Sequence, residues 1–213
     1  MERLIIEELL QWKTSPRRKP LILNGARQVG KTWILKHFGE MHYDNVAYIN
    51  CDKESLAAKL FEDYDTKRII QAIEAMTNTQ IVAGKTLIII DEIQEVPRGL
   101  HALKYFAENA PEHHIAVAGS LLGLLLHQGE SFPVGKVNML QMHPMTFLEF
   151  LKAMGEDKIY QQLLNREWSV TNTVHEKIVK HLRMYLYVGG MPEAVQAYCD
   201  NVPLREIRTI HNE

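Results

Sequence analysis

Short apolar runs alternate with stretches of helical spacing over the first two-thirds of the chain. Five runs have the length and β-rich composition of strands: residues 21–23, 46–50, 87–90, 115–118 and 137–142. The run at 87–90 is aliphatic throughout, as expected of a central strand buried on both faces. Strands that alternate with helices predict an α/β fold, with a parallel sheet of about five strands flanked by helices.

Both ends of the chain read as helical. Residues 4–12 place apolar side chains at helical spacing and predict an amphipathic opening helix. Strand signals stop near residue 146, and helices are expected at 146–154, 157–164, 174–187 and 192–198. We therefore expect a core of residues 1–145 and a small helical lid or linker of residues 146–213. The last stretch, residues 203–213, places Leu204, Ile207 and Ile210 on one helical face and ends without a helix stop signal, so the chain is expected to be truncated before a further C-terminal domain.

Composition narrows the class of protein. The chain has 213 residues, of which 46% are hydrophobic and 23% charged, a balance typical of a folded globular protein with one domain and a small addition. No apolar stretch approaches the roughly 18 residues that cross a bilayer, and no signal peptide is recognisable. We expect a cytoplasmic protein without a membrane partner.

The charge of the chain gives little support for nucleic-acid binding. The formal net charge is -2, and one short basic run, Arg17, Arg18 and Lys19, lies between two prolines. Such a run is usually a solvated linker, although a local basic patch remains the other reading. Nucleic acid therefore stays an unsupported partner.

A glycine-rich stretch follows the first expected strand and precedes a helix expected at 33–38. Residues 25–32 read Gly-Ala-Arg-Gln-Val-Gly-Lys-Thr, which matches the P-loop pattern G-x-x-x-x-G-K-[ST] in the required context. Glycines allow successive backbone N–H groups to turn toward phosphate oxygens, and the helix N-terminus adds positive charge. The residues expected to bind nucleotide here are Gly25, Ala26, Arg27, Gln28, Val29, Gly30, Lys31, Thr32 and Trp33.

Two acids follow the aliphatic run at 87–90, as in a Walker B element. Within the P-loop, Lys31 is expected to reach the β- and γ-phosphates, and the Thr32 hydroxyl is expected to ligate Mg²⁺. Asp91 would help to hold the ion, and Glu92 would orient or deprotonate the attacking water. Together these residues predict a P-loop ATPase with ATP and Mg²⁺ as cofactors. A guanine-reading Asn-Lys-x-Asp motif and a transporter signature are both absent from the sequence.

With these motifs in place, the chain resembles the AAA+-like ATPases of bacteria and archaea that carry an N-terminal P-loop domain and a C-terminal domain of uncertain role. Further elements of the resemblance are Ile-Asp-Glu-Ile-Gln at 90–94, Ala-Gly-Ser at 118–120, His-Pro-Met-Thr-Phe-Leu-Glu-Phe at 143–150 and Gly-Gly-Met-Pro-Glu-Ala at 189–194. The resemblance implies a sensor role toward the γ-phosphate for Ser120 and restraint of the catalytic glutamate by Asn50. It also implies a lid contact to the nucleotide through Pro192.

The resemblance leaves two functions open. The first is an ATPase whose hydrolysis drives a conformational switch. The second is a regulatory nucleotide-binding module with negligible turnover that acts as an interaction scaffold. The family commonly has arginine where this chain has Lys136, and lysine lacks the bidentate fork of arginine, which favours the second reading slightly. A homo-oligomer, or a protein partner bound through the lid or a missing C-terminal domain, is the expected assembly.

Overall fold

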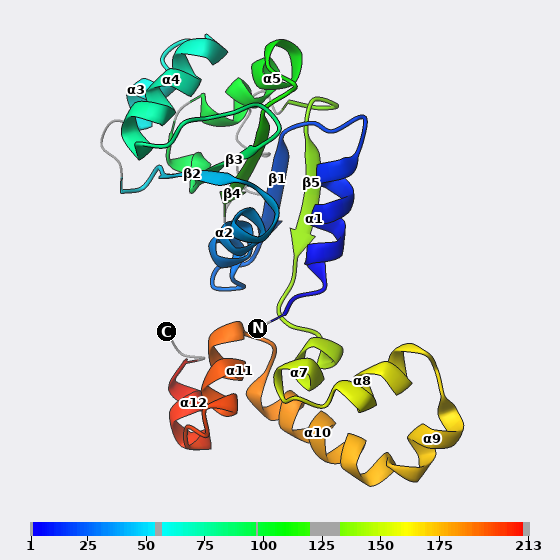
Figure 1. Ribbon diagram of the computed structural model, residues 1–213. Helices are drawn as coiled ribbons and strands as arrows, with labels where there is room; N and C mark the ends of the chain where they lie inside the picture. The colour runs from blue at the N-terminus through cyan, green and yellow to red at the C-terminus, as the bar shows by residue number, and fades with distance from the viewer. Residues whose placement is uncertain (1, 54–56, 97, 120–132, 211–213) are drawn as a thin grey trace. The chain divides into compact units, whose positions relative to one another are not determined.

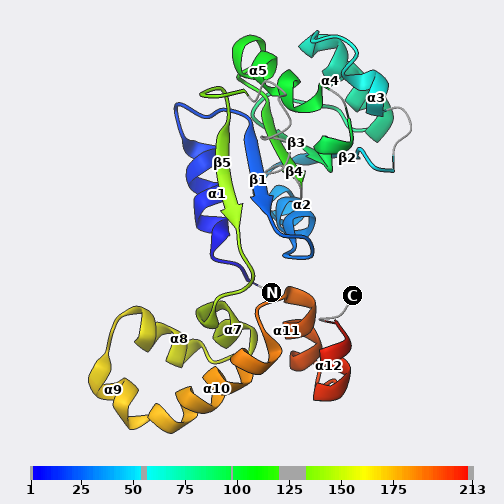
Figure 2. The same cartoon turned by 180° about the vertical axis from the view of Figure 1, so that it is seen from behind.

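The computed structural model describes residues 2–53, 57–96, 98–119 and 133–210. Within these ranges the chain forms two compact units, a core of Ile5–Met142 and a helical unit that joins residues 2–4 to residues 143–210. Figures 1 and 2 show the elements of each unit from opposite sides. Among the described residues, no helix combines the length and the apolar character that crossing a membrane requires.

The core is built on a parallel sheet. Its strands pair in the order β2-β3-β4-β1-β5, and every pairing is parallel. All side chains of β3 and β4 are buried, because these strands lie inside the sheet and carry almost only apolar residues. The five strands predicted from the sequence are confirmed: β1 (Leu21–Gly25), β2 (Asn45–Asn50), β3 (Thr86–Asp91), β4 (His114–Gly119) and β5 (Asn138–Met142).

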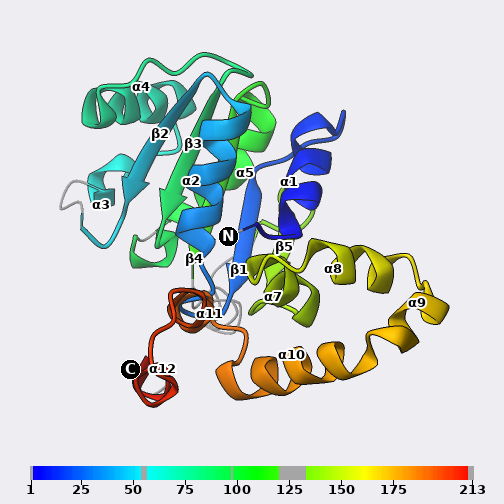
Figure 3. The ribbon, with the colours of Figure 1, turned by 60° about the horizontal axis from the view of Figure 1, so that its bottom comes forward.

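Helices cover both faces of this sheet (Figure 3). Helices α1 (Ile5–Thr14) and α2 (Lys31–His42) lie on one face, where Gly39 of α2 approaches the side chains of Val46 and Leu87. Alternate residues of β3 point to the other face and join an apolar cluster with α4 (Thr66–Thr77) and α5 (Gly99–Asn109). A short helix, α3 (Ala57–Leu60), and a 3-10 turn, η1 (Ile93–Glu95), complete the described core.

The helical unit contains six helices in its described part. They are α7 (Phe147–Ala153), α8 (Asp157–Leu164), α9 (Trp168–Thr173), α10 (His175–Val188), α11 (Pro192–Cys199) and α12 (Leu204–Ile210). Two apolar clusters hold them together, one around Phe150 and one around Leu151. Helix α9 was not expected from the sequence, whereas the others were.

Residues 2–4 belong to the helical unit although they begin the chain. The Arg3 Nε donates to Glu149 Oε1 at 2.9 Å, and the Leu4 backbone N–H donates to the same oxygen at 2.9 Å. Glu149 also closes a capping box with Thr146 at the start of α7. The sequence had assigned residues 2–4 to the core; the role of the helical unit as a lid stays a prediction.

Candidate nucleotide site

The phosphate-binding loop expected at residues 25–32 lies between β1 and α2. Gln28 has φ 62° and Gly30 has φ 90°, so two residues in the left-handed region bend the loop sharply. Val29 is fully buried, which anchors the loop in the core, whereas Ala26, Arg27 and Gln28 face solvent. A curled loop that leads into a helix N-terminus is a suitable cradle for an anion.

Residue 25 must be glycine for a second reason, which the P-loop motif does not include. It pairs in register with Met142 of β5, and a Cβ added to Gly25 would lie 2.3 Å from the Met142 carbonyl oxygen. Real Cβ atoms essentially never come so close to a backbone oxygen, so any larger residue would push β1 and β5 apart. Sheet packing therefore requires glycine here, independently of the ligand contact that the motif predicts.

The Lys31 ammonium is turned back onto the loop. Its Nζ donates to the carbonyl oxygens of Gly25 and Ala26 at 2.9 and 2.6 Å, and the residue is 7% exposed. Burial lowers the pKa of Lys31, opposed by the nearby carboxylates of Glu92 and Asp91. To contact a phosphate, the ammonium would have to give up these two carbonyl oxygens.

The Thr32 hydroxyl donates to Asp91 Oδ2 at 2.7 Å. The two residues come from distant places in the chain: Thr32 lies in the first turn of α2, and Asp91 is the last residue of β3. Strand β4 separates β3 from β1, and α2 packs against all three strands, with Thr32 of its first turn beside the acid. The structure thus brings together the hydroxyl and the carboxylate that the sequence assigned to the metal.

Asp91 has another hydroxyl partner, Tyr48, which sequence reasoning missed. The Tyr48 hydroxyl donates to Asp91 Oδ2 at 3.1 Å, and Lys36 Nζ lies 3.4 Å from the centre of the tyrosine ring. Burial, together with the charge of Asp91, raises the pKa of Tyr48 to about 12, so the phenol stays protonated and donates. The available signal was alternation along β2, which points Tyr48 and Asn50 to the same face.

Asn50 lies beside Asp91 in the sheet, but its side chain is engaged elsewhere. Its Nδ2 donates to the Tyr48 hydroxyl at 3.4 Å, and its Oδ1 accepts from the backbone N–H of Asp52 at 3.0 Å. Within the described residues no hydrogen bond joins Asn50 to Glu92. The restraint of Glu92 by Asn50 stays a prediction that this geometry does not support.

Glu92 leaves β3 in a left-handed conformation with φ 52°. Its backbone N–H donates to Asp91 Oδ1 at 3.1 Å, and its carboxylate accepts from Gln94 Nε2. The side chain is partly exposed, unlike the buried Asp91. Two adjacent acids therefore occupy different environments, one satisfied by hydroxyls and one held by an amide.

The remaining residues of the prediction lie in different places. Ser120 lies outside the described residues, directly after the end of β4. Pro192 is the first residue of α11 in the helical unit, and the nearby Gly190 packs against the backbone of Met145. Lys136 forms an ion pair with Glu108 at 2.9 Å and precedes β5, so it lies at the opposite end of the sheet from the loop.

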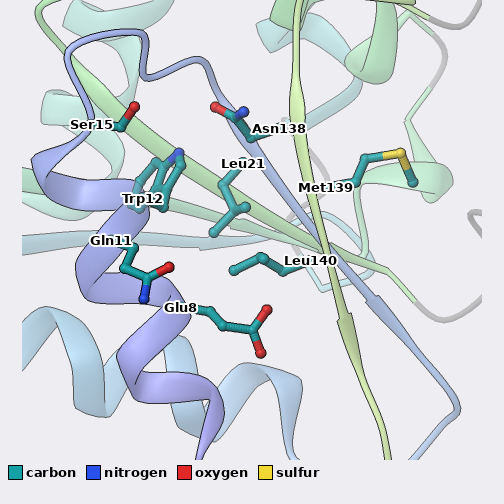
Figure 4. A pocket seen from close by; sticks show the side chains of 8 residues that line it. All are labelled: Glu8, Gln11, Trp12, Ser15, Leu21, Asn138, Met139 and Leu140. Carbon is teal, nitrogen blue, oxygen red and sulfur yellow. The ribbon is translucent and has the colours of Figure 1, made fainter.

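A cavity of about 270 Å³ in the core is separate from this site (Figure 4). It is lined by residues of α1 and the turn after it and by the first residues of β1 and β5, namely Leu21 and Asn138. The phosphate-binding loop follows the last residue of β1. Because the strands are parallel, the cavity and the loop lie toward opposite ends of these strands.

The donor set at the loop fits a magnesium ion that is shared with a phosphate ligand. Across the described residues no group of three or more His, Cys, Asp or Glu side chains is placed to hold a metal ion. Mg²⁺ is commonly bound by one or two protein oxygens together with substrate phosphates and water. The Thr32 hydroxyl and the Asp91 carboxylate are oxygen donors of that kind.

Comparison with solved structures agrees with this fold. The structure of Drosophila ORC bound to DNA is 13% identical over 95% of this chain and 64% of that chain, with a TM-score of 0.51. The structure of the Aeropyrum pernix ORC1 protein in complex with DNA is 15% identical over 72% of this chain and 47% of that chain, with a TM-score of 0.42. At these identities the first likeness concerns the fold alone.

Sequence comparison finds a relative and a family. An uncharacterized protein of Haemophilus influenzae is 25% identical over 208 residues, which are 94% of this chain and 45% of the relative. The chain thus spans less than half the length of the curated relative it matches. Residues 17–151 match the family model described as the AAA domain, and this match covers both β1 with its loop and β3 with its acids. The chain therefore belongs to the AAA domain family of P-loop ATPases.

Proposed function

We propose that this chain binds ATP with Mg²⁺ and hydrolyses it. The observation that carries the proposal is the 2.7 Å contact between the Thr32 hydroxyl and Asp91 Oδ2, next to the buried Lys31. A hydroxyl, a carboxylate and an ammonium that converge beside a curled loop match the needs of a triphosphate with its metal ion. Membership of the AAA family supports the same reading.

The residues divide the work by chemistry. The loop N–H groups would bind phosphate oxygens, and Lys31 would neutralise charge on the β- and γ-phosphates. Thr32 and Asp91 would hold Mg²⁺, which, when bound, withdraws charge from the phosphate oxygens. Glu92 would orient the attacking water and accept its proton, because its carboxylate is less buried and carries no hydroxyl donor.

Hydrolysis is proposed to be coupled to a conformational switch. The core and the helical unit are joined by two chain connections, after Leu4 and after Met142. A second copy or another protein is proposed as the partner of the helical unit, which exposes Trp168 and Leu186 by 59% and 72%. Exposed aromatic and aliphatic side chains of this size are common at protein interfaces.

Phosphate release with Mg-ATP tests the hydrolysis. We expect Glu92→Gln to reduce the rate by about 10² to 10⁴, because it removes a positioned base. Glu95→Gln is the matched control, since Glu95 is an exposed glutamate three residues away and should leave the rate unchanged. ATP affinity, measured by equilibrium titration, should be retained in both variants.

Two outcomes would contradict the proposal. Equal and near-zero rates in all three proteins, with ATP still bound, would instead identify a regulatory nucleotide-binding module without turnover. Failure of the unaltered chain to bind ATP at millimolar concentration would reject nucleotide binding altogether. Lys31→Ala distinguishes binding at the loop from background binding. Removal of the lysine should weaken ATP binding only if the nucleotide occupies the proposed site.

A further inference from the structure

The Gln94 side chain is the residue that contacts the Glu92 carboxylate. Gln94 lies in the η1 turn, and its Nε2 donates to Glu92 Oε2. Its Oε1 is buried and has no hydrogen-bond partner in the part of the chain that the structure describes. A carboxylate only accepts hydrogen bonds, so the amide nitrogen must face Glu92 and the oxygen must be the unpaired atom.

An unpaired buried acceptor is uncommon in folded proteins. Leaving such a group without a partner destabilises the arrangement, because the group loses its hydrogen bonds to water without gaining a donor from the protein. The Gln94 amide therefore makes a charge-assisted hydrogen bond through its nitrogen, whereas its oxygen has lost its bonds to water and gained none from the described residues. This balance is what a reversible contact requires, because a stable structural contact would satisfy both ends.

The backbone around Gln94 is also strained. Glu92 has φ 52° and Arg98 has φ 66°, both left-handed conformations that residues other than glycine rarely adopt. Ile93, between Glu92 and Gln94, is buried against Gly99, and the Arg98 guanidinium donates to the Glu62 carbonyl oxygen at 2.9 Å. The turn is thus anchored on both sides of Gln94, and Glu92, which Gln94 contacts, has a strained backbone.

We propose that Gln94 is a positioning residue that holds Glu92 in a resting orientation and limits the rate of hydrolysis. The inference rests on the proposed ATPase function. Asn50 was expected to restrain Glu92, but its hydrogen bonds go to Tyr48, Asp52 and Lys53. Glu92 must exchange the Gln94 amide for the attacking water before it can act. The unpaired Oε1 makes the resting contact less stable and so lowers the free energy needed to break it.

Steady-state kinetics of Gln94→Leu test the proposal. Leucine is similar in size and removes both the donor and the unpaired acceptor. We expect kcat for ATP to rise about 2- to 10-fold, the rate equivalent of one net hydrogen bond. KM and ATP affinity should not change, because Gln94 is not proposed to contact the nucleotide. Gln94→Asn, whose shorter amide does not reach Glu92, should raise kcat in the same way.

Two controls separate positioning from general damage. Gln71→Leu changes an exposed glutamine of α4 and should leave kcat at the native value. Glu92→Gln, measured in parallel, reports on the proposed function itself. A native chain that turns over, with turnover lost in Glu92→Gln, establishes that function whatever the Gln94 variants do.

The outcomes are distinct. An unchanged or lower kcat in Gln94→Leu overturns the restraint, and so does a joint change of kcat and KM that follows loss of stability. A higher kcat in Gln94→Leu but not in Gln94→Asn also overturns the restraint. Both variants remove the bond to Glu92, so the difference would come from the polarity of the side chain instead. If no variant and no native protein hydrolyses ATP, the proposed function and this inference fall together.

Discussion

Asp91 is a buried carboxylate whose oxygens accept hydrogen bonds from the protein itself. It is 3% exposed, and it accepts from the hydroxyls of Thr32 and Tyr48 and from the backbone N–H of Glu92. Buried charges are tolerated when hydrogen bonds replace the lost water. These bonds hold the carboxylate in a fixed position at the end of β3.

Tyr48→Phe is expected to weaken this arrangement. The change removes one hydroxyl donor from a buried charge while keeping the ring, so the free energy of unfolding should fall by about 1–3 kcal/mol. Urea unfolding followed by circular dichroism measures the change. Tyr187→Phe is the control, because Tyr187 is 47% exposed. This variant should unfold like the native protein. Equal stability of both variants would show that the Tyr48 hydroxyl contributes nothing.

Sequence motifs identified the residues of the loop and both acids, but not their partners. Lys31 and Thr32 were predicted from the fixed spacing of the P-loop motif, and Asp91 and Glu92 from their place directly after the aliphatic strand. The contact of Tyr48 with Asp91 depends on the register between β2 and β3, and the contact of Gln94 with Glu92 depends on a left-handed turn at Glu92. Neither the register nor this turn is written in a local pattern, so the contacts required a structure.

At the scale of elements, strand and helix identities were predictable, and some boundaries were not. Helix α2 was expected from residue 33 but begins at Lys31, because Gly30 adopts a left-handed conformation and lets the helix start directly after it. Helix α9 was missed since Trp168 and Val170 are exposed, so its sequence lacks a buried apolar stripe. Apolar periodicity reports burial, and it fails where a helix buries little.

Gly190→Ala is expected to destabilise the helical unit. A Cβ at residue 190 would lie 2.3 Å from the Met145 carbonyl oxygen, at a backbone that is hydrogen-bonded to Met145. We expect a loss of about 3 kcal/mol or more, since backbone cannot yield as a side chain can. Thermal unfolding measures the loss.

Gly155→Ala is the control for this prediction, because it tests a Gly→Ala change that causes no steric clash. Gly155 has φ 73° and no neighbour within 4 Å of an added Cβ, so only the left-handed backbone opposes alanine. The expected loss there is about 1–2 kcal/mol. A Gly190→Ala protein as stable as Gly155→Ala would refute the steric argument.

Across the whole molecule, the beginning of the chain is tied to residues far along the sequence. Arg3 and Glu149 are 6% and 4% exposed and form an ion pair at 2.9 Å. Although burial opposes it, hydrogen bonds from Thr146, Leu4 and Arg3 hold the pKa of Glu149 below its usual value. No local pattern in residues 2–4 predicts a partner about 146 positions away.

Glu149→Gln is expected to lower the free energy of unfolding by about 3–5 kcal/mol at pH 7, because it leaves the Arg3 charge buried without a carboxylate. The lowered pKa of Glu149 means that its contribution is present above the ordinary glutamate pKa of 4.5 and is lost as the pH falls below it. Urea unfolding at pH 7 and at pH 4 should therefore show a smaller acid sensitivity in the variant. Glu193→Gln, at an exposed site on α11, should keep the native pH dependence.

The contact between Gly25 and Met142 has a mechanical consequence. Gly25 is the root of the phosphate-binding loop, and Met142 is the last core residue before the chain continues into the helical unit. Because the two backbones touch without room for a single methyl group, the loop root cannot shift toward β5 without displacing Met142, the residue after which the chain leaves the core.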